Sequence, residues 1–454
     1  MNEVLEFLRD AVWGLPLILL LAGTGLYLTI LLQGLQFRRL VHALSLALFR
    51  RDEPGGAGDI SHFQSLMTAL GATLGTANIV GVAVALTAGG PGALFWMWVA
   101  AFVSMATKYS EAVLGVRFRE TDRRGEKCGG PMYYLENGIR WGRLGRGLAL
   151  AFALFASIAA FGVGNGIPSQ AIAEAVGNVS GLPALGVGVV TAVLAGAVIL
   201  GGIRSIGRFA GLVIPVMLAA YAGVALWALV QHADAVPVAF GAIFEGAFSG
   251  RAAGGGVVGY TIGQALRSGL TQGLVSSEAG LGTGGIAAAA ARTREPVRQA
   301  LISMTQTFIN TVVLCTLTGL VLLTSGAWTS GADGATLAQL AYSTALPGGG
   351  GSWFVAVTLS CFAFTTIIGW AYYGERNIQY LVGSRAVVPY RLAFLAVIVL
   401  SSTARLDVVW LASQVMNALM AFPNLIGLVL MSGIVVRETR SYFNRYLDQP
   451  PKRR

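Results

Sequence analysis

Long apolar runs, roughly 18 residues or more each, recur along the whole 454-residue chain. A helix of about 20 such residues crosses a hydrocarbon core of roughly 30 Å, so each run can span a membrane. Only 11% of the residues are charged, against about 25% in a typical soluble domain. The polar side chains are too few to cover a soluble surface of this size. We therefore expect an all-α polytopic membrane protein.

The first residues, MNEVLEFLRDAVWG, carry Glu3, Glu6 and Asp10 against Arg9. A secretory signal begins with a positively charged region, so this acidic start does not fit one. We expect residues 15–32 to be retained as the first span.

Eleven spans are predicted, at residues 15–33, 62–88, 93–116, 147–174, 183–201, 209–231, 257–291, 299–325, 352–382, 391–403 and 407–436. Setting the first aside leaves five in residues 62–231 and five in residues 257–436. Because each half has an odd number of spans, the second half lies in the membrane with the opposite orientation to the first. Such inverted repeats are a common design of secondary transporters. The remaining segments are predicted as an N-terminal extra helix with a cytoplasmic connector (1–61), an extracellular connection (232–256) and a basic cytoplasmic tail (437–454).

The basic residues predict the orientation. With the N-terminus outside, all but five of the 31 Lys and Arg fall on the cytoplasmic side; the exceptions are Arg9, Arg251 and Arg405 outside and Lys108 and Arg267 within spans. Basic residues resist translocation, so the C-terminus is expected in the cytoplasm. The net charge of +10 is then a topology signal, and no nucleic-acid partner is expected.

Two spans are interrupted by nearly the same letters. LGTANI (74–79) lies in the first span of the first half, and LGTGGI (281–286) lies in the first span of the second half. Glycine eases the unwinding of a turn, after which freed amides can hold a carboxylate and freed carbonyls a small cation. Alternatively, these glycines only permit close helix packing. Their corresponding positions favour two broken helices that face each other and bind a zwitterionic amino acid with Na⁺.

Polar side chains near these breaks are candidates for binding. Glu278 lies deep in the second broken span, next to Ser276 and Ser277. A carboxylate in a membrane is rare and usually functional. Glu278 could bind a cation, relay a proton or satisfy the amides of the unwound turn.

The ninth span contains the adjacent hydroxyls Thr365 and Thr366. They could supply oxygen ligands to a cation, or bond back to carbonyls of their own helix. Trp370 follows one turn after Thr366 and could form the wall of a pocket. Gln170, in the fourth span, could recognise a polar group of a substrate or bond across helices.

The other ionisable residues predict no catalysis. Glu375 with Arg376, and Lys108 with Glu111, are interpreted as ion pairs at span ends. The cysteines and histidines are Cys128, Cys315, Cys361, His42, His62 and His232. Their spacing matches no metal site, disulfide framework or nucleophile–base pair. We expect neither an intramembrane enzyme nor a cofactor.

Several stretches together resemble the alanine/glycine:cation symporters, also called sodium:alanine symporters. The similarity runs from GDISHFQSLMTALGATLGTANIVGVA to MNALMAFPNLIGLVLMSGIV, nearly the whole chain. Further matching stretches are GGPGALFWMWVAAFVSMATKYSEAVLGVRFR, GGPMYYLENG, SSEAGLGT, TREPVRQAL and GWAYYGER. The resemblance implies the leucine-transporter-like fold of the amino acid-polyamine-cation superfamily, with five plus five inverted helices and one extra helix in front.

The resemblance also implies a function and a site. It implies a Na⁺-coupled, less often H⁺-coupled, importer of small neutral amino acids, chiefly alanine and glycine. The implied substrate site consists of Gly75, Thr76, Ala77, Asn78, Gln170, Ser276, Ser277, Gly280 and Trp370. By analogy with the wider fold, the cation site would use carbonyls of Gly71 and Leu74 and hydroxyls of Thr365 and Thr366.

The chain departs from the family's usual letters at both breaks. Ala77 stands where the family usually has glycine, in GTGN, and VSSEA (275–279) stands where it usually has FSNEA. A methyl group at Ala77 narrows the approach of the backbone to a carboxylate. Val275 and Ser277 are smaller than their usual counterparts. A pocket of different shape is expected, so a strict preference for alanine is not implied.

The sequence thus predicts a multi-pass transporter of the cytoplasmic membrane that imports alanine or glycine with Na⁺ by alternating access. Its expected partners are the amino acid, Na⁺ as coupling ion and membrane lipid; no protein partner is indicated. A proton-coupled carrier that uses Glu278 is the alternative, and a channel is a further one.

Overall fold

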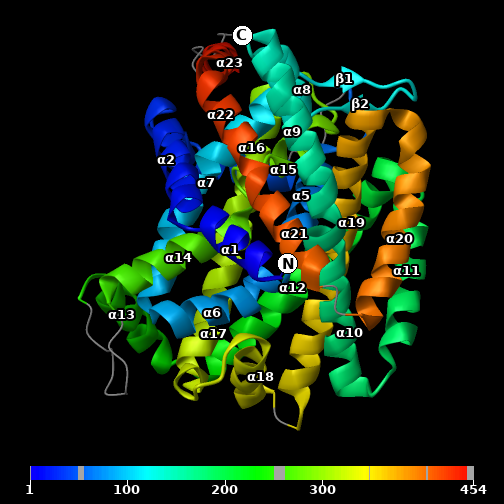
Figure 1. Cartoon of the computed structure of the whole chain (residues 1–454). Helices are drawn as coiled ribbons and strands as arrows, with labels where there is room; N and C mark the ends of the chain where they lie inside the picture. The colour runs from blue at the N-terminus through cyan, green and yellow to red at the C-terminus, as the bar shows by residue number, and fades with distance from the viewer. Residues whose placement is uncertain (1, 50–55, 250–260, 347, 405–406, 447–454) are drawn as a thin grey trace.

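The chain folds almost entirely into helices (Figure 1). The computed structural model describes residues 2–49, 56–249, 261–346, 348–404 and 407–446. Arg251, Arg405, residues 250–256 of the predicted connection and residues 447–454 of the predicted tail lie outside these ranges. Two short strands, β1 (Glu120–Thr121) and β2 (Lys127–Cys128), pair antiparallel.

The helices in chain order are α1 (Asn2–Val12), α2 (Leu15–Leu31), α3 (Leu35–Arg38), α4 (Leu40–Phe49), α5 (His62–Thr73), η1 (Thr76–Asn78), α6 (Val80–Gly89), α7 (Gly92–Arg117), α8 (Pro131–Gly138), α9 (Gly142–Phe161), η2 (Gly162–Gly166), α10 (Ile167–Ser180), α11 (Ala184–Ile199), α12 (Gly202–Gln231) and α13 (Ala235–Phe248). They continue with α14 (Ile262–Ser277), α15 (Thr283–Ala289), α16 (Pro296–Thr307), η3 (Phe308–Leu314), α17 (Cys315–Thr324), η4 (Ala327–Thr329), α18 (Gly334–Ala345), α19 (Gly350–Val382), η5 (Ser384–Ala386), α20 (Val387–Thr403), α21 (Asp407–Leu419), α22 (Ala421–Leu430) and α23 (Ser432–Tyr446).

Within the described ranges, seven helical segments are long and apolar enough to cross a membrane. They are Glu3–Leu31, Gly142–Ser180, Gly202–Gln231, Pro296–Thr324, Gly350–Val382, Ser384–Thr403 and Asp407–Leu430. Shorter apolar helices are Leu40–Phe49, Val80–Gly89, Ala184–Ile199 and Ala235–Phe248. These helices confirm a polytopic helical membrane protein.

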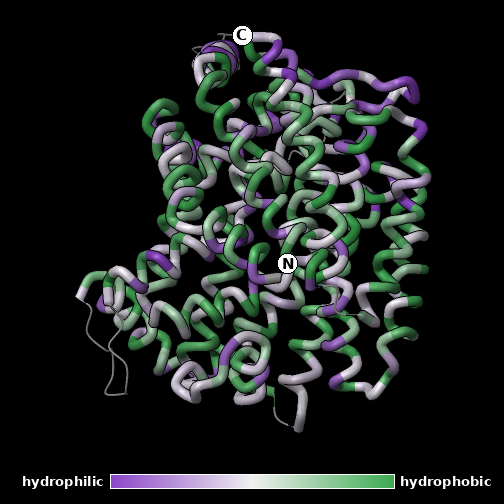
Figure 2. The backbone as a smooth tube through the Cα atoms, viewed as in Figure 1, coloured by the Kyte–Doolittle hydropathy of each residue, from purple (hydrophilic) through white to green (hydrophobic). Residues whose placement is uncertain are grey.

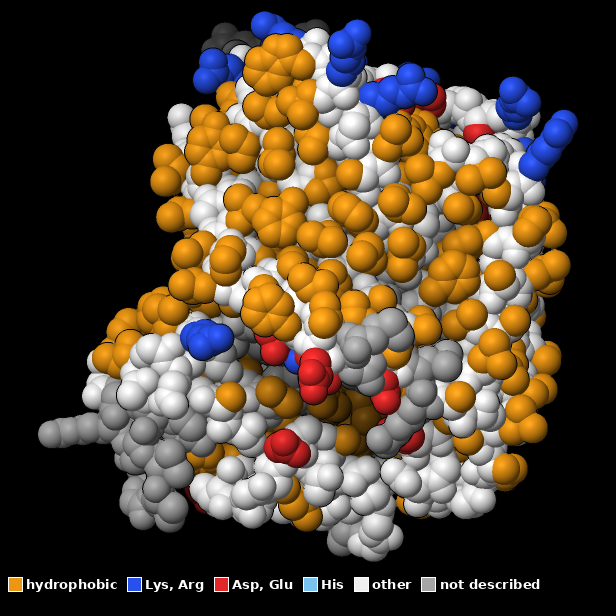
Figure 3. All heavy atoms as spheres, in the orientation of Figure 1, with side chains coloured by type: hydrophobic (Ala, Val, Ile, Leu, Met, Phe, Trp, Pro, Cys, Tyr) orange, Lys and Arg blue, Asp and Glu red, His pale blue; other side chains and the backbone are white. Residues whose placement is uncertain are grey.

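Hydrophobic and basic residues occupy different parts of the surface. Hydrophobic residues follow the upright helices (Figure 2), whereas Lys and Arg gather along the upper end of the molecule, near α8, α23 and the β1–β2 hairpin (Figure 3). The opposite end carries α13, α18 and the connection from α10 to α11. Charged side chains are costly in hydrocarbon, so the uncharged band between the two ends fits a membrane.

Both predicted interruptions are present. α5 ends at Thr73, a 3₁₀ turn follows at Thr76–Asn78, and α6 begins at Val80. α14 ends at Ser277, and α15 begins at Thr283. In the second break the backbone is left-handed at Glu278 (φ 49°), Gly280 (φ 92°) and Gly282 (φ 83°), a conformation that glycine adopts readily.

The two broken helices also start alike. Ser61 at the start of α5 and Thr261 at the start of α14 each form a capping box with the glutamine three residues later, Gln64 and Gln264. Such a box satisfies orphan amides at a helix start in a reciprocal way. The likeness of the two segments therefore extends from the break to the first turn.

Several helices outside the predicted spans were not foreseen. They are α1, α4, α13 and α18. α13 occupies part of the predicted connection 232–256, and α8 forms in the stretch GGPMYYLENG. These helices are short, so their length alone did not distinguish them from connecting loops.

Candidate functional site

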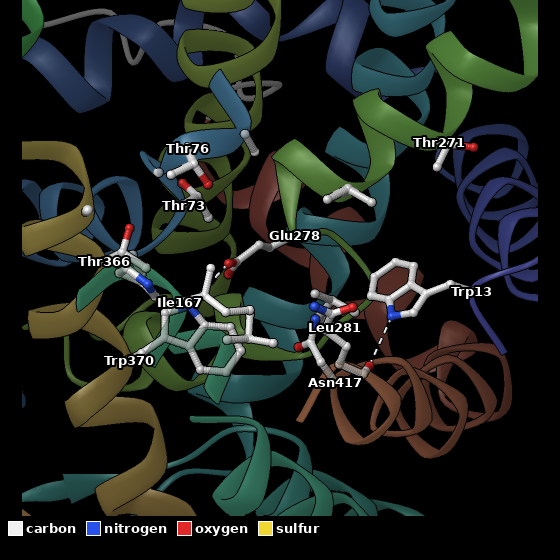
Figure 4. A pocket seen from close by; sticks show the side chains of 18 of the residues that line it. Trp13, Thr73, Thr76, Ile167, Thr271, Glu278, Leu281, Thr366, Trp370 and Asn417 are labelled. Carbon is white, nitrogen blue, oxygen red and sulfur yellow. Dashed lines mark hydrogen bonds between the residues drawn. The ribbon is translucent and has the colours of Figure 1, made fainter. Parts of the chain in front are cut away.

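A cavity of about 390 Å³ lies between the two breaks. It is lined by Arg9, Trp13, Ala72, Thr73, Gly75, Thr76, Ala77, Val163, Ile167, Pro168, Thr271, Val275, Glu278, Leu281, Ala363, Thr366, Trp370, Gln414 and Asn417. Figure 4 shows Glu278 in its middle, with Thr76, Thr366 and Trp370 to one side and Trp13 to the other. In Figure 3 the surface below the hydrophobic band is hollowed, and acidic side chains surround the hollow.

The first break presents backbone to this cavity. Gly75, Thr76 and Ala77 are partly exposed and line it, between buried neighbours on both sides. The first N–H that bonds back within the turn is that of Asn78, to the carbonyl of Gly75 at 3.3 Å. As at any helix start, the N–H groups of Thr76 and Ala77 have no acceptor inside the turn. They are suited to bind an anion.

Asn78 is placed elsewhere. Its side chain is fully buried and donates to the Asn310 side-chain oxygen at 2.6 Å. The Thr318 hydroxyl donates to its carbonyl at 3.0 Å. These bonds connect the first break to η3 and α17, so Asn78 fixes the position of the break and does not line the cavity.

Glu278 reaches the cavity from the second break. Its carboxylate accepts one hydrogen bond from Trp370 Nε1 at 3.3 Å and another from the Thr283 hydroxyl at 3.2 Å. Its backbone carbonyl accepts from Lys108 Nζ at 3.2 Å. The side chain is partly buried, so one face of this carboxylate remains open to a ligand.

Glu111 of α7, rather than Glu278, binds the amides of the unwound turn. One Glu111 oxygen accepts from the N–H groups of Gly280 at 2.8 Å and Gly282 at 3.0 Å. The same oxygen accepts from the Asn424 side chain at 2.9 Å. The interpretation of Lys108 with Glu111 as an ion pair at a span end is therefore wrong, because both side chains are completely buried against the second break.

The other candidates of the second break point away from the cavity. The Ser276 hydroxyl donates to the carbonyl of Gly273 at 3.2 Å, and the Ser277 hydroxyl donates to that of Leu274 at 3.0 Å. Gly280 is buried, and its N–H is taken by Glu111. All three support the break and do not line the cavity.

The four candidates for a cation site lie where α5 and α19 meet. The Thr366 hydroxyl donates to the carbonyl of Leu74 at 3.2 Å and to that of Phe362 at 3.1 Å. Thr365 donates to the same Phe362 carbonyl at 2.9 Å. A Cβ placed on Gly71 would lie 3.4 Å from Cβ of Thr365. The structure thus brings the four together, with both hydroxyls bonded back to their own helix.

Trp370 and Gln170 differ in their placement. Trp370 lines the cavity and is only 1% exposed. A Cβ on Gly164 would lie 2.3 Å from Trp370 Cβ, so a glycine in the π turn η2 allows this close approach. Gln170 lies on α10 outside the lining and donates to Glu174 at 2.6 Å.

α1 also contributes to the cavity, which the sequence did not predict. Arg9 and Trp13 line the cavity, and Trp13 Nε1 donates to the carbonyl of Gln414 at 3.0 Å. Asn417, two residues before the end of α21, lines it as well. The signal was present in the mixed polar and aromatic letters of residues 1–14, which predict an amphipathic helix at an interface.

Ion pairs tie the basic end of the molecule together. Arg376 binds Glu126 and lies 3.6 Å from Asp122, whereas Glu375 binds Arg391 at 2.7 and 3.0 Å. Glu375 and Arg376 thus do pair at a span end, but with other residues and not with each other.

Asp122 and Arg119 form further hydrogen bonds at the basic end of the molecule. Burial acts to raise the pKa of Asp122, but hydrogen bonds from Gln379 and from two backbone N–H groups hold that pKa below its ordinary value. Arg119 donates to the carbonyls of Ala57, Ala289, Ala291 and Thr293 at 2.7–2.9 Å. The network closes this end between the two broken helices.

Broken helices around a central cavity define a secondary transporter of the helical type. A profile of the sodium:alanine symporter family matches residues 1–452. The sodium/alanine symporter AgcS of Methanococcus maripaludis is 47% identical, over 97% of each chain. An uncharacterized transporter of Haemophilus influenzae is 46% identical, over 98% of this chain and 96% of its own. The chain belongs to the sodium:alanine symporter family.

Two further similarities extend this picture. The probable sodium/glutamine symporter GlnT of Bacillus subtilis is 33% identical, over 97% of this chain and 91% of its own. Among solved structures, a variant of the Eremococcus coleocola manganese transporter matches with a TM-score of 0.50 at 13% identity, over 86% of this chain and 89% of its own. At that identity the match shows a shared fold only. The family and these relatives are transporters, and nothing in them points to catalysis.

Proposed function

We propose that the chain is a Na⁺-coupled symporter that carries small neutral amino acids, alanine and glycine, into the cell. One observation carries the proposal: Thr76 and Ala77, whose amides have no acceptor inside their own turn, and the carboxylate residue Glu278 line one cavity. Membership of the sodium:alanine symporter family and the name of the 47% identical relative support the ion and the substrate class.

The two poles of the cavity match a zwitterion. The N–H groups of Thr76 and Ala77 would bind the α-carboxylate, as helix starts do. The free face of Glu278 would bind the α-ammonium group in a charge-assisted hydrogen bond. Trp370 and the Ala77 methyl group would limit the size of the side chain, which favours the smallest amino acids.

The Na⁺ site is proposed beside the first break. The carbonyls of Gly71 and Leu74 and the hydroxyls of Thr365 and Thr366 are hard oxygen donors. The hydrogen bond of 3.2 Å from the Thr366 hydroxyl to the Leu74 carbonyl supports this proposal, because it holds two of these oxygen atoms together beside the first break. Na⁺ there would order the break and so prepare it for the carboxylate.

We further propose eleven membrane crossings, as five plus five inverted helices behind an extra N-terminal helix. The protein would lie in the inner membrane of the cell. Its N-terminus would be outside, and its basic end would be in the cytoplasm. In this placement the ion pairs of Arg376 and Arg391 close the cytoplasmic side, and the cavity opens outward. Transport would proceed by alternating access, driven by Na⁺ entry worth about 2.3 kcal/mol per 100 mV.

A proton-coupled carrier is the second candidate, because Glu278 is a carboxylate that lines the cavity and could carry a proton. Uptake of alanine into proteoliposomes, at fixed pH and with Na⁺ replaced by choline, separates the two. Loss of uptake supports Na⁺ coupling, and undiminished uptake that follows the pH gradient supports proton coupling. Saturable counterflow distinguishes either carrier from a channel.

A further inference from the structure

A second cavity, of about 170 Å³, lies at the basic end of the molecule, away from the central one. Its walls are the turn from α2 to α3 and one face of α23. In Figure 1 these elements lie together at the upper end, beside the C-terminal end of the described chain. None of its lining residues belongs to the central cavity.

Three arginines line this cavity: Arg38, Arg39 and Arg440. Among the described residues, no carboxylate lines it. Two acids that pair with arginines at this end are occupied elsewhere, since Glu438 pairs with Arg117 at 3.2 Å and Glu295 with Arg445 at 3.6 Å. The cavity therefore has a net positive wall that suits an anion, and guanidinium groups bind phosphate oxygens well.

The shape of the cavity is fixed by tightly bonded backbone. Gln33 (φ 55°) and Gly34 (φ 63°) both adopt left-handed backbone and turn the chain sharply after α2. The buried Gln36 side chain donates to the Thr29 hydroxyl at 2.9 Å and to the Phe102 carbonyl at 3.2 Å, which anchors the turn to α7. The other wall is anchored to α7 as well, by the hydrogen bond of 2.8 Å between the Tyr109 and Thr439 hydroxyls.

The surroundings of the cavity are apolar and face outward. Leu31, Leu35 and Phe443 contribute hydrophobic lining, and the guanidinium of Arg39 lies 4.6 Å from the centre of the Phe443 ring. Just beside it, Phe37 is 59% exposed and Val41 83% exposed. Figure 3 shows hydrophobic side chains covering the surface directly below the basic rim. A ligand with a phosphate head and apolar tails fits this arrangement better than a free ion does.

We infer that this cavity binds the headgroup of an anionic phospholipid, with Arg38 and Arg440 as its principal contacts. Basic pockets between helices at a membrane surface bind such headgroups. The acyl chains would lie along the exposed apolar residues of α3 and α4. The inference concerns a lipid site and does not depend on which amino acid or ion the central cavity carries.

Native mass spectrometry of the full chain, purified in detergent, tests the site by counting bound phosphatidylglycerol and phosphatidylcholine. Wild-type protein should retain phosphatidylglycerol in preference. Each arginine near a surface contributes about fivefold in affinity, so Arg38→Gln with Arg440→Gln should weaken phosphatidylglycerol binding about 25-fold. Arg39 is left in place because it packs on Phe443.

Matched variants keep the test decisive. Arg437→Gln removes a charge from the same helix outside the cavity and should leave binding unchanged. Arg38→Lys with Arg440→Lys should keep most of the phosphatidylglycerol binding. If the double glutamine variant folds poorly, Arg440→Gln alone should weaken that binding about fivefold. Equal retention of the two lipids by wild type, or equal loss in Arg437→Gln, would overturn the inference. Displacement by inorganic phosphate as effective as by lipid would overturn the lipid assignment.

Discussion

The two breaks share their letters but differ in what binds them. At the first break, Gly75, Thr76 and Ala77 are partly exposed to the cavity, and the amides of Thr76 and Ala77 have no partner in their own turn. At the second, the amides of Gly280 and Gly282 are bound by the buried carboxylate of Glu111. The amides of the second break are thus bound by a side chain of the protein itself, whereas those of the first break are the ones that we propose bind the substrate.

This difference shows that a sequence motif repeated in both halves does not require the same kind of site in both halves. Freed amides in a membrane must be satisfied, at a cost of several kcal/mol each if they are not. The second break meets that requirement from α7, through Glu111, while Asn424 of α22 donates to the freed carbonyl of Gly280. The carboxylate that this break contributes to the cavity lining is that of Glu278, beside the apolar side chains of Val275 and Leu281. In the proposed site, the amides of the first break would be satisfied by the carboxylate of the substrate.

The largest effect is expected from Glu111→Gln. The change removes a charged acceptor from two buried amides and one of the two carboxylates near the buried Lys108, so the protein should lose about 3 kcal/mol of stability. Thermal unfolding in detergent measures it. Lys108→Met added to Glu111→Gln should recover part of the loss. A variant as stable as wild type would show that the second break does not need Glu111.

Glu278→Gln should have the opposite effect to Glu111→Gln: it should impair transport and leave the stability of the protein unchanged. Loss of a charged hydrogen bond costs about 2 kcal/mol, so the half-saturation concentration for alanine should rise about 30-fold. Uptake into proteoliposomes measures it. Glu174→Gln on α10, outside the cavity lining, is the matched control. Equal kinetics in Glu278→Gln and wild type would remove Glu278 from the substrate site.

Thr366→Ala probes the proposed cation site of the first break. Removal of one oxygen ligand should raise the half-saturation concentration for Na⁺ about tenfold, with the amount of protein in the membrane unchanged. Ser360→Ala is the control, since the Ser360 hydroxyl also bonds back to α19, to Ala356 at 2.8 Å, but lies away from the breaks. If both variants keep the wild-type Na⁺ dependence, the Thr366 hydroxyl is not a ligand.

The smallest effect is expected from Ala77→Gly. Removal of one methyl group beside the amides should widen the approach of a carboxylate and change the preference between alanine and glycine by only a few-fold, about 1 kcal/mol at most. Competition of the two amino acids for uptake measures the ratio. An unchanged ratio would place the Ala77 methyl group away from the bound substrate.

Much of the fold followed from patterns that act locally. Apolar length predicted membrane helices, and glycine-rich letters predicted where α5 and α14 would stop. The membrane also made Glu278 conspicuous, because few carboxylates occur in apolar runs. The same reasoning should have marked Glu111 as functional or structural, but its neighbour Lys108 suggested an ordinary ion pair. Which of two buried carboxylates reaches a given amide depends on helix packing, which spacing does not encode.

By itself, the sequence determined the class of protein, the two places where helices break and the end of the molecule that carries the basic residues. These features follow from burial in hydrocarbon, because each membrane segment must satisfy the hydrogen bonds of its own backbone and keep its charged side chains out of the lipid. Only the tertiary structure decided that Glu111 fills the second break, that Ser276, Ser277 and Asn78 point away from the cavity, and that Arg9 and Trp13 line it. Most of these outcomes depend on contacts between residues far apart in the sequence, such as Glu111 with Gly280 and Trp13 with Gln414, and such contacts arise only when the helices pack.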